Sequence, residues 1–281
     1  MRRLLLAVVV AAAVVRPAPA AQRWETLPPT PAPIATDRSG AASINGIRIH
    51  YAIHGEGPPV ILLHGGLANA DYWGNQVPGL AADHTVILMD SRGHGRSTRD
   101  EARPYGYDLM ADDVIGLMDY LKIAKADIVG WSDGAILGLD LAMRHKDRVG
   151  KVFAFAANTV PSGIKDGFDS NPTFVAYIGR ARHEYEKLSA TPKQYDAFLD
   201  QIGRMWAEQP NWSDGQLRAI DTPVLIVDGD HDEAIKREHT EYIAATIPHA
   251  KLVFLTNTSH FAFLQDAAQF NFTLLQFLNG K

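Results

Sequence analysis

The sequence contains no cysteine, which excludes both disulfide bonds and attachment of a lipid to an N-terminal cysteine. It also lacks a membrane-spanning stretch, because its longest apolar run, residues 4–15, is well short of the roughly 20 residues that a spanning helix needs. Basic residues are fewer than acidic ones, 27 against 32, for a formal net charge of −5. An acidic chain is a poor candidate for binding nucleic acid or anionic membranes.

The N-terminus has the order of a secretory signal peptide. Arg2 and Arg3 precede the apolar run, and the small residues 18–20 follow it, which predicts cleavage after Ala20. Loss of the three arginines of that segment changes the net charge from −5 to −8. We therefore expect a secreted or periplasmic protein without a stable membrane span, with an uncleaved anchor as the alternative. The sequence does not indicate an oligomeric state.

After the leader, residues 21–42 are rich in proline and small residues, which predicts a tether. Residues 43–53 then contain two short apolar runs around Asn45-Gly46, the pattern of a β-hairpin. Further strands are predicted at residues 59–65, 85–90, 126–131, 151–158, 223–229 and 250–257. Helical patterns lie between them, such as residues 109–121. This alternation predicts an α/β fold with a mainly parallel sheet and helices on both faces.

No strand is predicted between residues 159 and 220, where only helical and aromatic patterns occur. An insertion of about sixty residues in a compact α/β domain is usually functional, so we expect a helical cap over a core of residues 43–158 and 221–281. Aromatic side chains of the cap are candidates to line a substrate pocket: Phe174, Tyr177, Phe198 and Trp206. Such a pocket would favour short-chain and aromatic esters over long-chain triglycerides.

The strand at residues 126–131 leads into G-x-S-x-G, with Ser132 between Gly130 and Gly134, and a helical pattern follows. A strand, a serine flanked by glycines and a helix are typical of a nucleophile elbow, in which a sharp turn raises the serine hydroxyl above the sheet. A glycine-rich loop whose serine caps a helix is the alternative. The strand and helix on either side favour the elbow.

A nucleophilic serine needs a base, and the base needs an acid to orient it. The motif predicts the chain order serine, acid, histidine, and His260 follows the last predicted strand. Three aspartates near the end of the preceding strand could supply the acid: Asp228, Asp230 and Asp232. Asp232 is preferred because it is far enough past the strand to reach an imidazole, and Asp230 is the alternative.

An acyl-transfer site also needs donors for the oxyanion. One is expected from the backbone N–H of Asp133, which follows the nucleophile, and the other from Gly66 in the loop after residues 59–65, with Leu67 as the neighbouring alternative. The Asp133 side chain has two interpretations. It either stabilises the N-terminus of the helix or faces the pocket and pairs with a cationic substrate.

From residue 43 to 278 the chain resembles the α/β-hydrolase superfamily. The resemblance is carried by HGG (64–66), DSRGHGRS (90–97), GWSDG (130–134), DGDHD (228–232) and SHF (259–261). It implies Asp232 as the acid, and GWSDG with AANT is similar to serine ester hydrolases of the valacyclovir-hydrolase-like type. Ala135 departs from many relatives, which carry glycine there.

Other motifs do not fit their patterns. GHGRST lacks the third glycine of a dinucleotide loop, so we interpret residues 90–97 as a structural turn beside the site. DGDHDEAIKREH has Glu233 and His239 where a calcium loop requires glycine and glutamate, and no H-E-x-x-H zinc motif occurs. No metal or organic cofactor is expected.

The sequence therefore predicts a serine hydrolase that cleaves small carboxylic esters through an acyl-enzyme. A perhydrolase or cofactor-free haloperoxidase, an aminopeptidase and a lactonase share the same catalytic residues and remain alternatives. A weakly hydrolytic ligand receptor is a further alternative from a different class.

Overall fold

The computed structural model of this protein describes residues 21–36 and 38–280. Within them, eight strands form one sheet in the order β1-β2-β4-β3-β5-β6-β7-β8. The strands are β1 (Ser39–Ile44), β2 (Ile47–His54), β3 (Pro59–Leu63), β4 (Thr85–Met89), β5 (Ala126–Trp131), β6 (Val149–Phe155), β7 (Val224–Gly229) and β8 (Lys251–Leu255). β2 pairs antiparallel with β1 and β4, and the other pairs are parallel. The predicted mainly parallel sheet is confirmed.

The hairpin between β1 and β2 turns at Asn45 and Gly46, whose φ angles are 46° and 84°. Two positive φ angles are what a tight two-residue hairpin turn requires. β1 begins at Ser39, which pairs with Ala52, four residues before the predicted start. No strand signal was visible there because residues 40–42 are small and are ordered only by pairing with β2.

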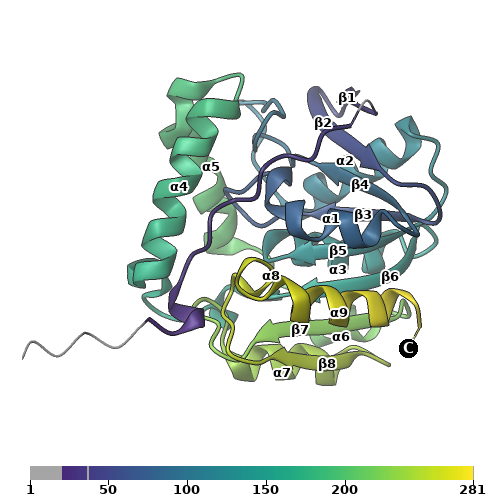
Figure 1. Cartoon of the computed structure of the whole chain (residues 1–281), viewed down its shortest axis with the longest axis vertical. Helices are drawn as coiled ribbons and strands as arrows, with labels where there is room; N and C mark the ends of the chain where they lie inside the picture. The colour runs from purple at the N-terminus through teal and green to yellow at the C-terminus, as the bar shows by residue number, and fades with distance from the viewer. Residues whose placement is uncertain (1–20, 37, 281) are drawn as a thin grey trace, which may run out of the picture.

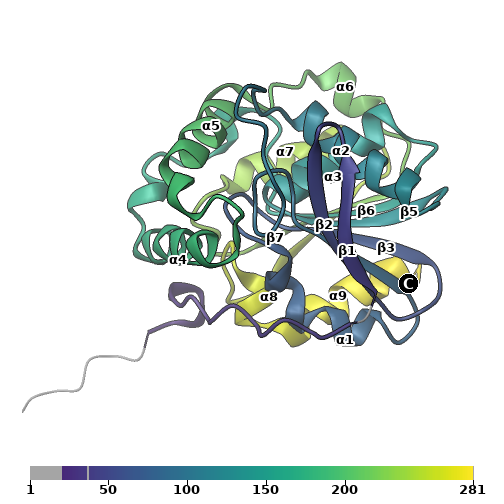
Figure 2. The same ribbon diagram turned by 90° about the horizontal axis from the view of Figure 1, so that it is seen from above.

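Helices cover both faces of the sheet (Figure 2). One face carries α1 (Val77–Leu80), α8 (Ala262–Gln265) and α9 (Ala267–Leu278), and the other carries α2 (Tyr107–Tyr120), α3 (Asp133–Arg144), α6 (Asp214–Arg218) and α7 (Arg237–Thr246). Alternate residues of β3 divide between the two hydrophobic clusters, with Val60 and Leu62 in one and Ile61 and Leu63 in the other. Both faces of β3 are buried, which explains its uninterrupted apolar sequence.

Within residues 159–220, α4 (Pro172–Leu188) and α5 (Tyr195–Glu208) stand beside the sheet as a separate pair (Figure 1). Buried residues of α5 fall on one stripe: Tyr195, Phe198, Ile202 and Met205. That spacing is the apolar face of an amphipathic helix. Short 3-10 helices complete the described chain: η1 (Arg23–Glu25), η2 (Ala70–Asn75), η3 (Pro161–Gly163), η4 (Phe168–Ser170) and η5 (Pro192–Gln194).

The predicted signal peptide, residues 1–20, lies outside the described residues. In the part of the chain that the structure describes, no helix has the length and apolarity to cross a membrane. Residues 21–36, where the sequence predicts a tether, run beside α4 and α8 before they reach β1 (Figure 1).

Candidate active site

Ser132 lies at a strained junction between β5 and α3. Its φ and ψ angles are 54° and −119°, a conformation that a residue with a side chain rarely adopts. The flanking glycines make the turn sterically feasible. A Cβ on Gly130 would lie 2.2 Å from the Gly134 carbonyl oxygen, and one on Gly134 would lie 2.0 Å from the Leu63 carbonyl oxygen. The geometry is therefore that of an elbow, and Ser132 borders a cavity.

His260 and Asp232 form a buried pair beside this elbow. His260 Nδ1 lies 2.7 Å from Asp232 Oδ2, and the two side chains are 2% and 3% exposed. The other carboxylate oxygen of Asp232 accepts hydrogen bonds from the backbone N–H groups of Ala234 and Ile235, at 2.6 and 2.7 Å. Both oxygens are thus engaged, so the carboxylate is held in one orientation towards the imidazole.

The other two aspartates have different partners. Asp230 accepts a hydrogen bond from the backbone N–H of Thr258 at 3.2 Å. Asp228 accepts one from Thr240 Oγ1 at 2.6 Å. Burial and the charge of Asp232 raise the pKa of Asp228 well above its usual range. Of the three aspartates, all of which the structure describes, Asp232 is the one in hydrogen-bonding contact with His260.

The pKa values of the pair move in opposite directions. Burial by itself would lower the pKa of His260, but Asp232 and Glu233 raise it above its usual value. Burial would likewise raise the pKa of Asp232, but His260 lowers it. An ionised Asp232 therefore stabilises a proton on the imidazole, which is what a base needs when it takes a proton from a serine hydroxyl.

Glu233 is a neighbour of this pair for which the sequence offered no signal. Its carboxylate accepts hydrogen bonds from the backbone N–H of His260 at 3.0 Å and from Ser259 Oγ at 3.3 Å. Glu233 follows Asp232 in the acid loop, so its side chain connects that loop to the histidine loop. The residue spacing within one loop does not show which other loop it will contact, so the sequence could not predict this role of Glu233.

The two segments expected to bind the oxyanion lie against each other. A Cβ on Gly66 would lie 2.7 Å from Asp133 Oδ2 and 2.3 Å from Trp206 Cζ2. The Gly66 carbonyl oxygen accepts a hydrogen bond from Tyr177 Oη. Leu67 follows with a φ of 66°, so the chain bends sharply at this point. The absence of a side chain at Gly66 is what allows this approach.

Asp133 lines the cavity, and the residue is 6% exposed. Tyr107 Oη donates to Asp133 Oδ1 at 2.9 Å, and Trp206 Nε1 donates to Asp133 Oδ2 at 2.9 Å. Burial raises the pKa of Asp133 to about 6, although these two donors partly offset it. Both donors are neutral, and among the described residues the carboxylate has no ion-pair partner.

The cavity has a volume of about 390 Å³. Residues that the sequence analysis named line it: Gly66, Leu67, Ser132, Asp133, Phe174, Tyr177, Trp206 and His260. Phe198 does not line it, because its ring packs in the core against Tyr185 and His94. Other lining residues were missed, among them Tyr107, Asn158, Ile164, Asp169, Ile178, Leu199, Gln209 and Ile235. A helical pattern shows which residues share a face but does not show whether that face meets the core or the cavity.

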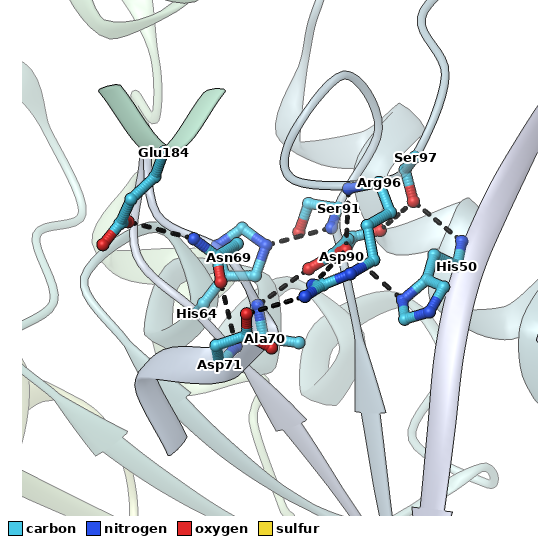
Figure 3. Close-up of polar contacts among 10 residues, drawn as sticks. All are labelled: His50, His64, Asn69, Ala70, Asp71, Asp90, Ser91, Arg96, Ser97 and Glu184. Atoms are coloured by element: carbon cyan, nitrogen blue, oxygen red, sulfur yellow. Dashed lines mark hydrogen bonds and ion pairs between the residues drawn. The ribbon is translucent and has the colours of Figure 1, made fainter. Parts of the chain in front are cut away.

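The turn at residues 90–97 is hydrogen-bonded to His64, Ala70 and Asp71, which flank Gly66 in the sequence (Figure 3). The fully buried carboxylate of Asp90 accepts hydrogen bonds from the backbone N–H groups of Ala70 and Arg96, at 2.7 and 2.8 Å. Burial would raise the pKa of Asp90, but His50, His64 and the Ala70 amide lower it to about 2. The carboxylate is therefore charged and joins the two loops.

No cluster of three or more histidine, aspartate or glutamate side chains suited to a metal ion occurs in residues 21–36 and 38–280. The Asp232 carboxylate is directed at a single imidazole, that of His260, which lines the cavity.

Residues 60–271 match the alpha/beta hydrolase family, and the chain belongs to this family. The sheet order and the covering helices are those of its fold, and the protein is a hydrolase. The predicted resemblance to the α/β-hydrolase superfamily is thereby confirmed.

Two curated relatives extend over most of the chain. It is 28% identical over 250 residues to a 2-hydroxymuconate semialdehyde hydrolase from Pseudomonas sp. (strain CF600), covering 80% of this chain and 88% of the relative. It is 28% identical over 256 residues to the serine hydrolase BPHL from Homo sapiens, covering 83% and 84%. Among solved structures, a mutant of the meta-cleavage product hydrolase CumD from Pseudomonas fluorescens IP01, complexed with acetates, superposes with a TM-score of 0.76 at 25% identity, covering 86% and 97%.

Proposed function

We propose that this hydrolase cleaves carboxylic esters through an acyl-enzyme on Ser132. The observation that carries the proposal is the buried His260–Asp232 pair, with 2.7 Å between Nδ1 and Oδ2. His260 lines the same cavity as Ser132, which lies on the strained elbow. A serine hydroxyl is a poor nucleophile until a base takes its proton, and an oriented imidazole is such a base.

In the proposed reaction, Ser132 Oγ attacks the ester carbonyl carbon while His260 Nε2 takes the hydroxyl proton. The backbone N–H groups of Gly66 and Asp133 donate to the oxyanion of the tetrahedral intermediate. The C–O bond then breaks, and His260 gives its proton to the departing alcohol. Water, deprotonated by His260, then attacks the carbonyl carbon of the acyl-enzyme. The bond to Ser132 Oγ breaks, His260 returns the proton to Ser132, and the acid is released. Loss of one oxyanion donor of this kind typically costs about 10²–10³ in kcat.

The charge and the volume of the cavity favour neutral or cationic esters of modest size as substrates. The described residues around it include two carboxylates, Asp133 and Asp169, and no arginine or lysine. Its 390 Å³ is near the lower end of the roughly 300–1,000 Å³ typical of small-molecule sites. An anionic substrate, such as the one in the name of the 2-hydroxymuconate semialdehyde hydrolase, would meet negative charge without a cation to pair with.

A panel of p-nitrophenyl esters with varied acyl groups, read as kcat/KM, tests the function. We expect turnover of acetate, butyrate and benzoate esters and little turnover of emulsified long-chain triglyceride. Ser132→Ala should reduce kcat by about 10⁴-fold or more, since removing the nucleophile of such a triad typically lowers kcat by at least this factor. A fluorophosphonate probe should label Ser132. Labelling of another serine, or hydrolysis that survives Ser132→Ala, would contradict the proposal.

We also propose that the protein is exported and that the mature chain begins at Ala21, on the basis of the arginines, apolar run and small residues at the N-terminus. The N-terminal sequence of the protein recovered outside the cytoplasm tests this. A first residue other than Ala21 would contradict the cleavage site.

A further inference from the structure

Residues 22–31, here called the N-terminal arm, lie along the cap helix α4 (Figure 1). Arg180 of α4 donates one hydrogen bond to the carbonyl oxygen of Pro28 at 2.6 Å and another to that of Leu27 at 2.9 Å. One turn further along α4, Glu184 accepts a hydrogen bond from Thr30 Oγ1 at 2.5 Å. Two charged side chains, four residues apart on one face of the helix, thus bind the arm.

The same arm contacts the loop that carries the acid directly and reaches the loop that carries the base through Gln265 of α8. The Trp24 ring stacks on the His231 ring with 3.8 Å between centroids, and His231 directly precedes the acid. Gln265 Nε2 donates to the Thr26 carbonyl oxygen at 2.8 Å and to Ser259 Oγ at 3.0 Å, and Ser259 directly precedes the base. The arm therefore touches the acid loop and α8 on one side and the cap on the other.

Helix α4 also forms part of the cavity wall. Phe174, Tyr177 and Ile178 of its N-terminal half line the cavity, and Arg180 follows within a turn. The outer side of α4 is open, since Val175 is 53% exposed. Its inner side packs through buried residues such as Tyr177 and Ala181. The charged hydrogen bonds from Arg180 to two carbonyl oxygens add a directional contact that joins the helix to the arm.

We propose that the N-terminal arm is a positioning element of the active site. It holds α4 at a set separation from the loops of Asp232 and His260, and so sets the width of the cavity where the acyl group of the substrate binds. Arg180 is the positioning residue at the cap end and Trp24 the one at the loop end. The inference rests on the proposed ester hydrolysis for its readout and goes beyond it in assigning a role to residues that touch no reacting atom.

The test compares two arginines of the same helix in the full-length protein. Arg180 binds the arm, whereas Arg182 pairs with Asp196 inside the cap. Arg180→Ala should raise KM for a bulky ester, p-nitrophenyl benzoate, by about tenfold, while kcat/KM for p-nitrophenyl acetate changes less than about twofold. Arg182→Ala should change neither ester by more than about twofold. Trp24→Ala should shift the benzoate-to-acetate ratio in the same direction as Arg180→Ala.

Equal effects of Arg180→Ala and Arg182→Ala would overturn the proposal. So would an equal loss on both esters, because that reports a general structural role. Arg180→Lys retains the charge but replaces the two-pronged guanidinium with a single ammonium group, so it should give an intermediate benzoate-to-acetate ratio. If Arg180→Ala does not fold, the ratios of Arg180→Lys and Trp24→Ala decide instead. Failure of the proposed function is distinguishable, because the unchanged protein would then hydrolyse neither ester and would not react with a fluorophosphonate.

Discussion

The floor of the cavity comes from loops at the ends of β3, β5, β6, β7 and β8, whereas its roof comes mainly from α4 and α5. Backbone geometry fixes the floor: Ser132 has a φ of 54°, and Gly134 approaches the Leu63 carbonyl oxygen too closely for any side chain. Side-chain hydrogen bonds attach the roof, such as that from Trp206 to Asp133. A floor held by the sheet keeps reacting groups in place, while a roof held by side chains can change with less cost to the fold.

This difference predicts two kinds of variant. Substitutions in the floor should reduce turnover of every ester, because they move or remove groups that act on the carbonyl. Substitutions in the roof should change the relative rates of different esters, because they reshape the space around the acyl group. The following experiments test this division, from the largest expected effect to the smallest.

The largest effect is expected in the floor, at Asp232. Asp232→Asn should lower kcat by about 10³–10⁴-fold for all esters, since the imidazole loses its charged, orienting partner. The acid limb of the kcat/KM profile should also change. Asp232 raises the pKa of His260, and His260 acts as a base only above that pKa. Without the carboxylate, the pKa falls and the limb moves to lower pH.

Asp230→Asn is the matched control, because Asp230 accepts a hydrogen bond from the Thr258 amide rather than from His260. It should stay within a few-fold of the parent protein with an unmoved acid limb. A larger loss in Asp230→Asn than in Asp232→Asn would reverse the assignment of the acid.

The contact between floor and roof is tested at Gly66. Gly66→Ala places a Cβ 2.3 Å from Trp206 Cζ2 and 2.7 Å from Asp133 Oδ2, so either the roof or the floor must move. We expect kcat/KM for p-nitrophenyl acetate to fall by about 10–100-fold. Adding Trp206→Ala should restore part of it, which a double-mutant cycle measures. If the double variant has the same kcat/KM as Gly66→Ala, the new Cβ instead clashes with Asp133 in the floor.

The smallest effect is expected at the Asp133 side chain, which belongs to the floor and accepts a hydrogen bond from Trp206 of the roof. Asp133→Ala retains the backbone N–H and removes the carboxylate. If the carboxylate pairs with a cationic substrate, amino-acid esters should lose about tenfold more kcat/KM than neutral esters of matched size. The preference of the parent protein for amino-acid esters should weaken as pH falls below about 6, where Asp133 becomes protonated. Equal losses for both kinds of ester would show that the Asp133 side chain does not pair with a cationic substrate and acts only at the N-terminus of α3.

Much of the fold could be predicted because it depends on short-range patterns. The apolar run at residues 126–131 coincides with β5, and Asn45-Gly46 forms the predicted hairpin turn. Both rest on rules that act within a few residues of the chain. The acid was harder to predict, because three aspartates lie within five positions. Their hydrogen-bond partners distinguish them, and the sequence does not show these partners.

The sequence by itself determined the order of strands and helices along the chain. It also determined the turn at Ser132, because the flanking glycines leave room for neighbouring backbone atoms. Only the tertiary structure decided what surrounds the carboxylate of Asp133, that Phe198 belongs to the core and that residues 22–31 bind the cap. Tyr177 donates to a carbonyl oxygen 111 positions away, and Arg180 to one 152 positions away. Contacts over such separations exist only after the sheet has brought distant loops together, so no local pattern encodes them.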